Sequence, residues 1–384
     1  MLSSDSHVME PPDLWAAAPE ELADVAPRVE PGEDADWWVV GGQRLFSFSV
    51  ATKAGLRFEG QERLLVDYRF ADVRPGSHLP EAHLADNEVD GVWGSVLYPS
   101  VATLLYDLDR PGAAAVLGRI YNDWMAEWCS QCPGRLRGVA ILDVDDVAAA
   151  VAELRRAAGR GLAGALIPVS PLAERPYLHP DYEPLWAAAE ELGMPLSLHI
   201  ATNRPPGEWK VLWTQWGFQG ADRFVRDSLA AMIFGGVFER HPGLRVVSVE
   251  HEASWVPHFL SRIDETYTQR TPRDGWRRFG DASLPSEHFR RSVVVSFIDD
   301  RVAIALRHEI GVECLVWGSD YPHAESTFPR SRQTVDALMA GVDDAERSAM
   351  TASTTAALYG FDPVPGPAAV GPGEGAGAPL QSRP

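Results

Sequence analysis

The chain has 384 residues, of which 45% are hydrophobic and 23% charged, a composition typical of a globular protein rather than a disordered one. Its 34 Lys and Arg residues stand against 54 Asp and Glu residues, which gives a formal net charge of −20. Such an acidic surface repels phosphate backbones and anionic lipid headgroups, so we expect neither nucleic acid nor a membrane surface as a partner.

The sequence shows no sign of export or of membrane insertion. No apolar run reaches the roughly 18 residues of a membrane span, and the first residues, MLSSDSHVMEPP, lack the basic and apolar regions of a signal peptide. The three cysteines, Cys129, Cys132 and Cys314, are too few for a disulfide framework in a chain of this length. We therefore expect a cytoplasmic protein.

Short apolar runs alternate with helical stretches along most of the chain. Apolar residues recur at helical spacing in 145–159, 182–193 and 227–243. Eight runs are typical of strands: 4–8, 91–99, 136–142, 161–168, 194–200, 244–250, 293–298 and 314–322. Because these runs are apolar almost throughout, they indicate parallel strands buried on both faces. Eight such strands with intervening helices predict an α/β fold, a closed (β/α)₈ TIM barrel.

The predicted barrel has an insert near its start and a tail at its end. Residues 1–362 are expected to form one barrel domain, in which 11–90 is a cap inserted after the first strand. Inside this cap, WWVVGGQRLFSFS predicts a β-hairpin that turns at Gly41 and Gly42. Residues 363–384 contain six Pro and five Gly among 22 residues and are expected to be disordered.

A second insert follows the fifth strand and carries three tryptophans. In EWKVLWTQWGF, Trp209, Trp213 and Trp216 recur at a spacing that places them on one face of a predicted helix. This face either packs against the barrel or a second subunit, or forms an aromatic wall for a substrate. Trp213 is the candidate substrate contact.

Polar side chains lie at the ends of four predicted strands, where the active sites of barrel enzymes are found. Asp5 and His7 point to the same side of the first strand because side chains alternate along a strand. His199 ends the fifth strand, His251 follows the sixth and Asp320 ends the eighth. Imidazole and carboxylate ligands suit a divalent cation, with Zn²⁺ expected first and Mn²⁺ as the alternative.

Three neighbouring residues are candidate substrate contacts. Glu10 and His323 lie within a few positions of the predicted ligands and either contact substrate or hydrogen-bond the loops of the barrel mouth. Arg204, just after the fifth strand, either pairs with a substrate carboxylate or is solvated.

At these positions the sequence resembles the amidohydrolase-related branch of the amidohydrolase superfamily, which includes the aminocarboxymuconate-semialdehyde and resorcylate decarboxylases. The matching stretches are DSHVMEPPDLW (5–15), LYPS (97–100), YNDWMAEW (121–128), HPDYEPLWAAAEELGMPLSLHI (179–200), VFERHPGLRVVSVEH (237–251) and WGSDYPHAEST (317–327). They are spread over the whole predicted barrel rather than confined to one motif.

The resemblance implies one metal ion held by Asp5, His7, His199 and Asp320, with His251 as an acid or base or as a further neighbour of the metal. Many relatives have His-x-His on the first strand where this chain has Asp-x-His, so Asp5 either binds the metal directly or orients His7. The only lysines, Lys53 and Lys210, do not lie at the end of the fourth strand, so a second, lysine-bridged metal is not expected.

Two reactions fit this predicted site. In non-oxidative decarboxylation of a small aromatic or enoic acid, the metal withdraws electron density and His251 or Asp320 supplies a proton. In hydrolysis of a C–C, ester or amide bond, Asp320 activates metal-bound water and His251 stabilises the developing charge. The resemblance favours decarboxylation. A barrel that only binds its ligand is the third hypothesis. The expected partners are a small-molecule substrate and, as in relatives, a second copy of the chain.

Overall fold

A computed structural model describes five parts of the chain: residues 1–48, 53–59, 67–204, 207–270 and 276–362. The tail that was predicted to be disordered, 363–384, lies outside the described residues.

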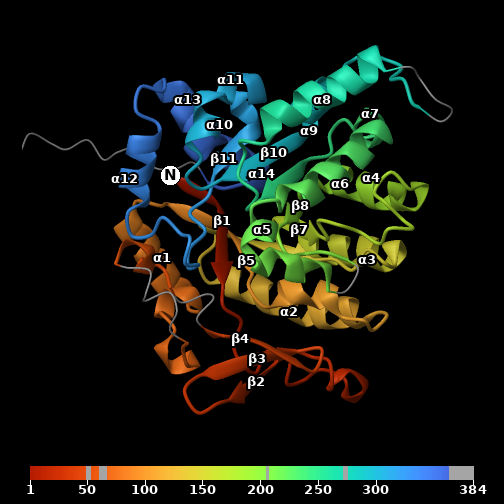
Figure 1. Cartoon of the computed structure of the whole chain (residues 1–384). Coiled ribbons are helices and arrows are strands. Elements are labelled where there is room, and N and C mark those ends of the chain that lie inside the picture. The colour runs from red at the N-terminus through yellow and green to blue at the C-terminus, as the bar shows by residue number, and fades with distance from the viewer. Residues whose placement is uncertain (49–52, 60–66, 205–206, 271–275, 363–384) are drawn as a thin grey trace, which may run out of the picture.

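The central element is a sheet of eight parallel strands in the described part of the chain (Figure 1). In sheet order these strands are β1 (Leu2–Val8), β5 (Gly94–Pro99), β6 (Leu136–Ile141), β7 (Gly164–Ile167), β8 (Leu196–His199), β9 (Val246–Val249), β10 (Val293–Phe297) and β11 (Leu315–Trp317). The two edges meet just beyond β11, where the His7 N–H donates to the Tyr321 carbonyl (2.6 Å) and the Asp320 N–H donates to the Asp5 carbonyl (2.9 Å). The predicted (β/α)₈ barrel is thereby confirmed.

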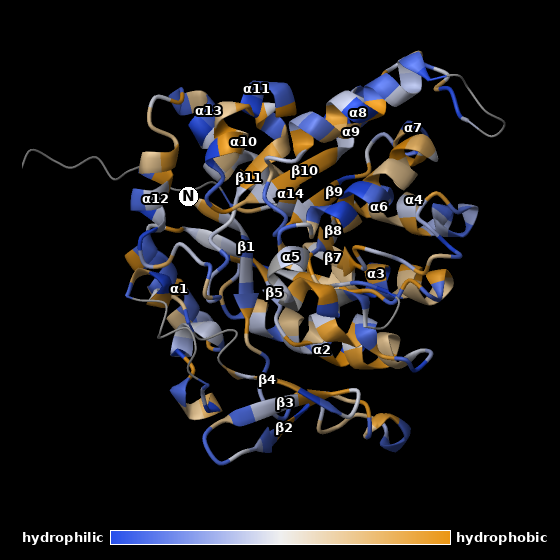
Figure 2. Cartoon of the chain, in the orientation of Figure 1, coloured by the Kyte–Doolittle hydropathy of each residue, from blue (hydrophilic) through white to orange (hydrophobic). Residues whose placement is uncertain are grey.

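Helices surround the strands. They are α1 (Pro80–Asp90), α2 (Ala113–Ser130), α3 (Val147–Gly159), α4 (Glu183–Leu192), α5 (Gln215–Phe218), α6 (Asp222–Phe234), α7 (Val237–Arg240), α8 (Val256–Gln269), α9 (Pro285–Ser292), α10 (Arg301–Ala305), α11 (Arg307–Ile310), α12 (Ser331–Leu338), α13 (Asp344–Ser348) and α14 (Thr354–Tyr359). In Figure 2 the barrel strands β10 and β11 are mainly hydrophobic and β1 is mainly hydrophilic, while α8 and α11 carry many hydrophilic residues. No helix in these described stretches is both long and apolar enough to cross a membrane.

The helix predicted over 227–243 is two helices. It is interrupted at Gly235 and Gly236, and Gly236 has a φ of 71°, a left-handed conformation that favours glycine. α6 therefore ends at Phe234, and α7 begins at Val237.

A small antiparallel sheet lies beyond the C-terminal end of β1 (Figure 1). Its strands are β2 (Arg28–Pro31), β3 (Asp36–Val40) and β4 (Gln43–Ser47). The predicted hairpin is β3–β4, and it turns at Gly41 (φ 58°) and Gly42 (φ 73°), the left-handed pair that such a two-residue turn requires. Strand β2 was not predicted from the sequence.

The prediction of one continuous helix that carries the three tryptophans is wrong. The segment forms a 3₁₀ turn (Glu208–Trp213) followed by the short helix α5, and Thr214 between them is extended (φ −99°, ψ 143°). Thr214 caps α5 by accepting a hydrogen bond from the Gly217 N–H on its side-chain oxygen. Trp216 is 67% exposed, and the side chain of Trp213, the predicted substrate contact, lies outside the described part of the structure.

Candidate active site

A cavity of about 850 Å³ lies at the C-terminal ends of the strands. Its floor includes His7 from β1 and His199 from β8. Its walls come from the small antiparallel sheet, from the loop after β5 and from the segment that ends in α5. The cavity therefore lies where the active sites of barrel enzymes are found.

The two histidines on the floor face each other through their Nε2 atoms, which are 3.3 Å apart. Nδ1 of His7 lies 3.0 Å from the Pro99 carbonyl oxygen, and Nδ1 of His199 lies 2.9 Å from the Ile200 carbonyl oxygen. Because a carbonyl oxygen only accepts, each Nδ1 carries the proton and each Nε2 presents a lone pair. Two such lone pairs cannot bond to each other, but they can bind one cation.

Two buried carboxylates lie beside these histidines. Oδ1 of Asp5 is 3.5 Å from His7 Nε2, and Oδ1 of Asp320 is 3.6 Å from it. Both aspartates are 0% exposed, and neither Asp5 oxygen has a hydrogen-bond partner among the described residues. The close approach of their two strands requires Gly318, because a Cβ there would lie 2.5 Å from the Asp5 Cβ. The sequence prediction that Asp5 and His7 converge is confirmed.

Glu250 is a member of this cluster that the sequence analysis missed. Its Oε2 lies 3.2 Å from His199 Nε2 and 3.8 Å from His7 Nε2. Glu250 follows β9 with a φ of 62°, a conformation uncommon outside glycine, which alters the course of the chain at the barrel mouth. The strand-end position of Glu250 was visible in the sequence, but this turn was not.

The cluster forms two overlapping groups of potential metal ligands, with donor atoms that all lie within 4.8 Å of one another in each group. They are Asp5, His7, His199 and Glu250, and His7, Glu250, Asp320 and His323. Metal bonds of about 2.0–2.2 Å place ligand atoms about 3–3.5 Å apart, close to the separations in this cluster. The donor types and their spacing therefore fit one divalent cation.

The pKa shifts of the cluster residues also favour a bound cation. Burial, and after it the charge of His323, lowers the pKa of His7 well below its usual range, and burial lowers the pKa of His199 to about 4. Both rings are thus neutral at pH 7, as metal ligands must be. Burial raises the pKa of Asp5 by removing its charge from water, and repulsion by the charge of Asp320 raises it further. A bound cation would relieve that repulsion.

His323 lies at the cavity and His251 does not line it. The ring of His323 packs on that of His7 with centroids 3.9 Å apart, and its Nδ1 is 2.8 Å from Asp320 Oδ1. His251 is buried, its Nδ1 is 3.3 Å from the Ser248 hydroxyl, and its Nε2 has no hydrogen-bond partner among the described residues. Burial, followed by the nearby His199, lowers the pKa of His251 to about 3.

Glu10 and Arg204, both candidate substrate contacts, are held by other parts of the protein, and for Glu10 this is the predicted alternative of hydrogen bonding a loop at the barrel mouth. Glu10 is 0% exposed, and its carboxylate accepts hydrogen bonds from the Val101 and Ala102 N–H groups at 2.9–3.1 Å. Arg204 donates to Asp145 Oδ2 (2.6 Å) and to the Tyr106 and Leu108 carbonyls (2.8 and 3.2 Å). Neither lines the cavity.

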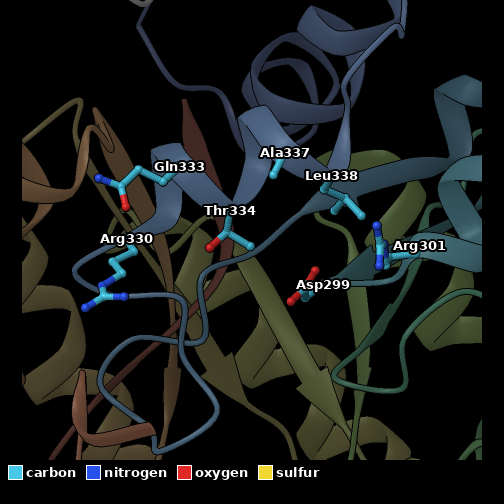
Figure 3. Close-up of a pocket in the computed structure, with 7 residues that line it drawn as sticks. All are labelled: Asp299, Arg301, Arg330, Gln333, Thr334, Ala337 and Leu338. Atoms are coloured by element: carbon cyan, nitrogen blue, oxygen red, sulfur yellow. The ribbon is translucent and has the colours of Figure 1, made fainter. Parts of the chain in front are cut away.

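Another cavity, of about 380 Å³, lies between the loop after β10 and helix α12 (Figure 3). It is lined by Asp299, Arg301, Arg330, Gln333, Thr334, Ala337 and Leu338. None of these residues belongs to the histidine and carboxylate cluster, so we assign the active site to the larger cavity.

A parallel barrel with imidazole and carboxylate groups gathered at the C-terminal ends of its strands is the architecture of a metal-dependent barrel enzyme. The sequence model for the family described as amidohydrolase matches residues 81–361, nearly three quarters of the chain. The chain therefore belongs to the amidohydrolase family and is an enzyme of that superfamily, which confirms the resemblance found in the sequence.

A curated relative agrees with this assignment, and two solved structures share the fold. The gamma-resorcylate decarboxylase of Rhodococcus jostii is 28% identical over 305 residues, which are 68% of this chain and 84% of that protein. The structure of amidohydrolase map2389c from Mycobacterium avium subsp. paratuberculosis has a TM-score of 0.76 at 22% identity and covers 94% of this chain and 98% of its own. The dihydroxybenzoic acid decarboxylase from Polaromonas, solved with manganese and the inhibitor 2-nitroresorcinol, has a TM-score of 0.63 at 17% identity and covers 94% and 96%.

Proposed function

We propose that this chain is a metal-dependent, non-oxidative decarboxylase of aromatic carboxylic acids. The observation that carries the proposal is the pair of Nε2 lone pairs of His7 and His199, 3.3 Å apart beside buried carboxylates at the floor of a large cavity. The decarboxylase activity of the relatives supports this choice over hydrolysis.

One divalent cation would be held by Asp5, His7, His199 and Asp320, with Glu250 beside it. It would draw electron density from a substrate carboxylate and a neighbouring hydroxyl group bound to it. Zn²⁺ suits these ligands, and the manganese in the Polaromonas enzyme supports Mn²⁺ as the alternative.

The protein's own groups would orient the substrate and deliver a proton. The Pro99 and Ile200 carbonyls fix the two imidazoles, so the ligand atoms are preorganised before substrate binds. The carbon that loses CO₂ must gain a proton, and His323 lines the cavity with an Nε2 that has no hydrogen-bond partner among the described residues. We therefore add His323 as a third candidate proton donor, together with His251 and Asp320 from the sequence analysis.

The test is CO₂ release from 2-hydroxybenzoate and 2,6-dihydroxybenzoate by the full chain, first stripped of metal with a chelator and then restored with Zn²⁺ or Mn²⁺. We expect release only after restoration. The variant His199→Ala should lose it, whereas His308→Ala should keep it, because His308 is a surface histidine 65% exposed and paired with Glu346.

Two outcomes would contradict the proposal. CO₂ release that survives both metal removal and His199→Ala would disprove the metal centre. If the protein releases no CO₂ from aromatic acids but cleaves an ester or C–C bond in a metal-dependent way, the site would be assigned to hydrolysis instead.

A further inference from the structure

The cavity has a second, apolar part above the metal-binding cluster. Two groups of large apolar side chains line it, one from the antiparallel sheet and one from the segment after β8: Trp37, Leu45 and Phe46, and Ile200, Leu212 and Phe218. Its volume of about 850 Å³ is in the upper part of the range of about 300–1,000 Å³ that holds drug-sized ligands. A single aromatic ring bound at the metal leaves much of this space unfilled.

One wall of this apolar part is incompletely buried. Phe218 lines the cavity yet is 51% exposed, and its neighbour in α5, Trp216, is 67% exposed without lining it. Exposed apolar surface around a concave site is typical of a ligand-binding surface. A ligand in the cavity would cover the ring of Phe218 but not that of Trp216.

The charges of the described lining residues disfavour a second anionic group on that ligand. Lys53 is the one lysine or arginine among the described lining residues, and it faces the charges of Asp67 and Glu325. Apart from the proposed metal, the described lining thus has three carboxylate side chains, those of Glu250, Asp67 and Glu325, and one lysine. An anion in the apolar part would lose its hydration and would meet, among the described lining residues, one cation, Lys53, which already faces Asp67 and Glu325.

We infer that the substrate is an aromatic carboxylic acid with one anionic end at the metal and an uncharged apolar substituent that lies between the antiparallel sheet and α5. This inference rests on the proposed function, since it takes the metal cluster as the site of the carboxylate. The substituent is larger than a hydroxyl or methyl group and makes contact with Phe46, Leu212 and Phe218.

The test uses 2-nitrophenols, in which a nitro group replaces the carboxylate so that no CO₂ can be lost. Substituents of increasing length, hydrogen, methyl, ethyl and propyl, are placed at position 4 or 5. Binding to the metal-loaded full chain is measured by titration calorimetry. Burial of each methylene should tighten binding about fourfold in at least one series. A carboxyethyl substituent, similar in length to propyl but charged, should bind no more tightly than the parent compound.

A matched pair of variants locates the effect. Phe218→Ala should reduce the ratio of propyl to parent affinity about fourfold or more, whereas Trp216→Ala should change it less than twofold. Both side chains are exposed aromatics on the same short helix, so neither variant is expected to disturb folding.

The outcomes separate this inference from the proposed function. Affinity that stays flat along both series while the parent compound binds would overturn the apolar substituent and leave the decarboxylase proposal standing. An equal gain in affinity from the carboxyethyl and propyl substituents would overturn the inference that the substituent is uncharged. Rising affinity in an enzyme that releases no CO₂ from any aromatic acid would overturn the proposed function and keep the apolar subsite. No binding of any nitrophenol would overturn both.

Discussion

Replacing Glu10 by Gln is expected to remove a pH-dependent loss of stability. Glu10 is fully buried, and its carboxylate accepts hydrogen bonds from the N–H groups of Val101 and Ala102. These hydrogen bonds hold the chain that follows Ser100, a residue that lines the cavity. Burial nevertheless raises the pKa of Glu10 from 4.5 to about 7, because the favourable hydrogen bonds only partly offset the desolvation of the charge.

The sign and size of the effect follow from this pKa. An acid whose folded pKa lies above its unfolded pKa is bound to its proton more tightly in the folded state. Its stabilising contribution is therefore fully present below pH 4.5 and is lost as the pH rises through about 7. A difference of about 2.5 between the two pKa values, at about 1.4 kcal/mol for each pKa unit, gives a full loss of about 3.5 kcal/mol in the free energy of unfolding.

The assay is urea unfolding of the wild type and Glu10→Gln at pH 5, 6, 7 and 8. Gln stays neutral, and its side-chain oxygen can still accept the two hydrogen bonds that Glu10 Oε1 accepts. The wild type should therefore lose about 2.5 kcal/mol relative to the variant between pH 5 and pH 8, since part of the full loss has already occurred at pH 5. Other titrating groups cancel in this comparison because both proteins contain them. Parallel pH profiles for the two proteins would refute the reasoning.

Three further predictions concern the metal, the proton donor and Arg204. Metal at about one hundred times its dissociation constant should stabilise the wild type and His308→Ala by about 2.7 kcal/mol in thermal unfolding but leave His199→Ala unchanged, and equal stabilisation of all three would contradict the site. Loss of a general acid lowers kcat by about 100-fold or more. We expect this in steady-state assays of His323→Gln, and a loss confined to His251→Gln would assign the proton to His251. Arg204→Ala should lower the free energy of unfolding by about 2 kcal/mol, measured by urea unfolding, because it leaves Asp145 and two carbonyls unpaired. A large rise in KM without loss of stability would instead place Arg204 at the substrate.

The barrel was predictable because its strands carry a strong local signal. A run such as VVVSF in β10 is buried at every position, and this is the pattern of a parallel strand covered on both faces. Strand β2 (Arg28–Pro31) lacked that signal, since its residues are mostly exposed and it is held by pairing with β3. Its formation depends on the hairpin next to it rather than on its own sequence.

The positions of site residues on a strand were predictable, because side chains alternate along a strand. The positions of residues in turns were not predictable. Asp5 and His7 share a strand, so their convergence follows from its period of two. Glu250 and His251 follow β9 in a turn with a positive φ at Glu250, and this conformation is set by the surrounding fold. Glu250 joins the cluster and lines the cavity, whereas the buried His251 does not line it, and residue type and spacing could not reveal this difference.

Metal stoichiometry and its link to CO₂ release test the central claim most directly. The full chain is stripped, titrated with Zn²⁺ or Mn²⁺ and analysed for bound metal by elemental analysis, while CO₂ release from an aromatic acid is followed in the same samples. The account predicts one metal ion per chain, with activity rising in proportion to occupancy. A protein that binds no metal, or one that releases CO₂ equally well without it, would contradict the account.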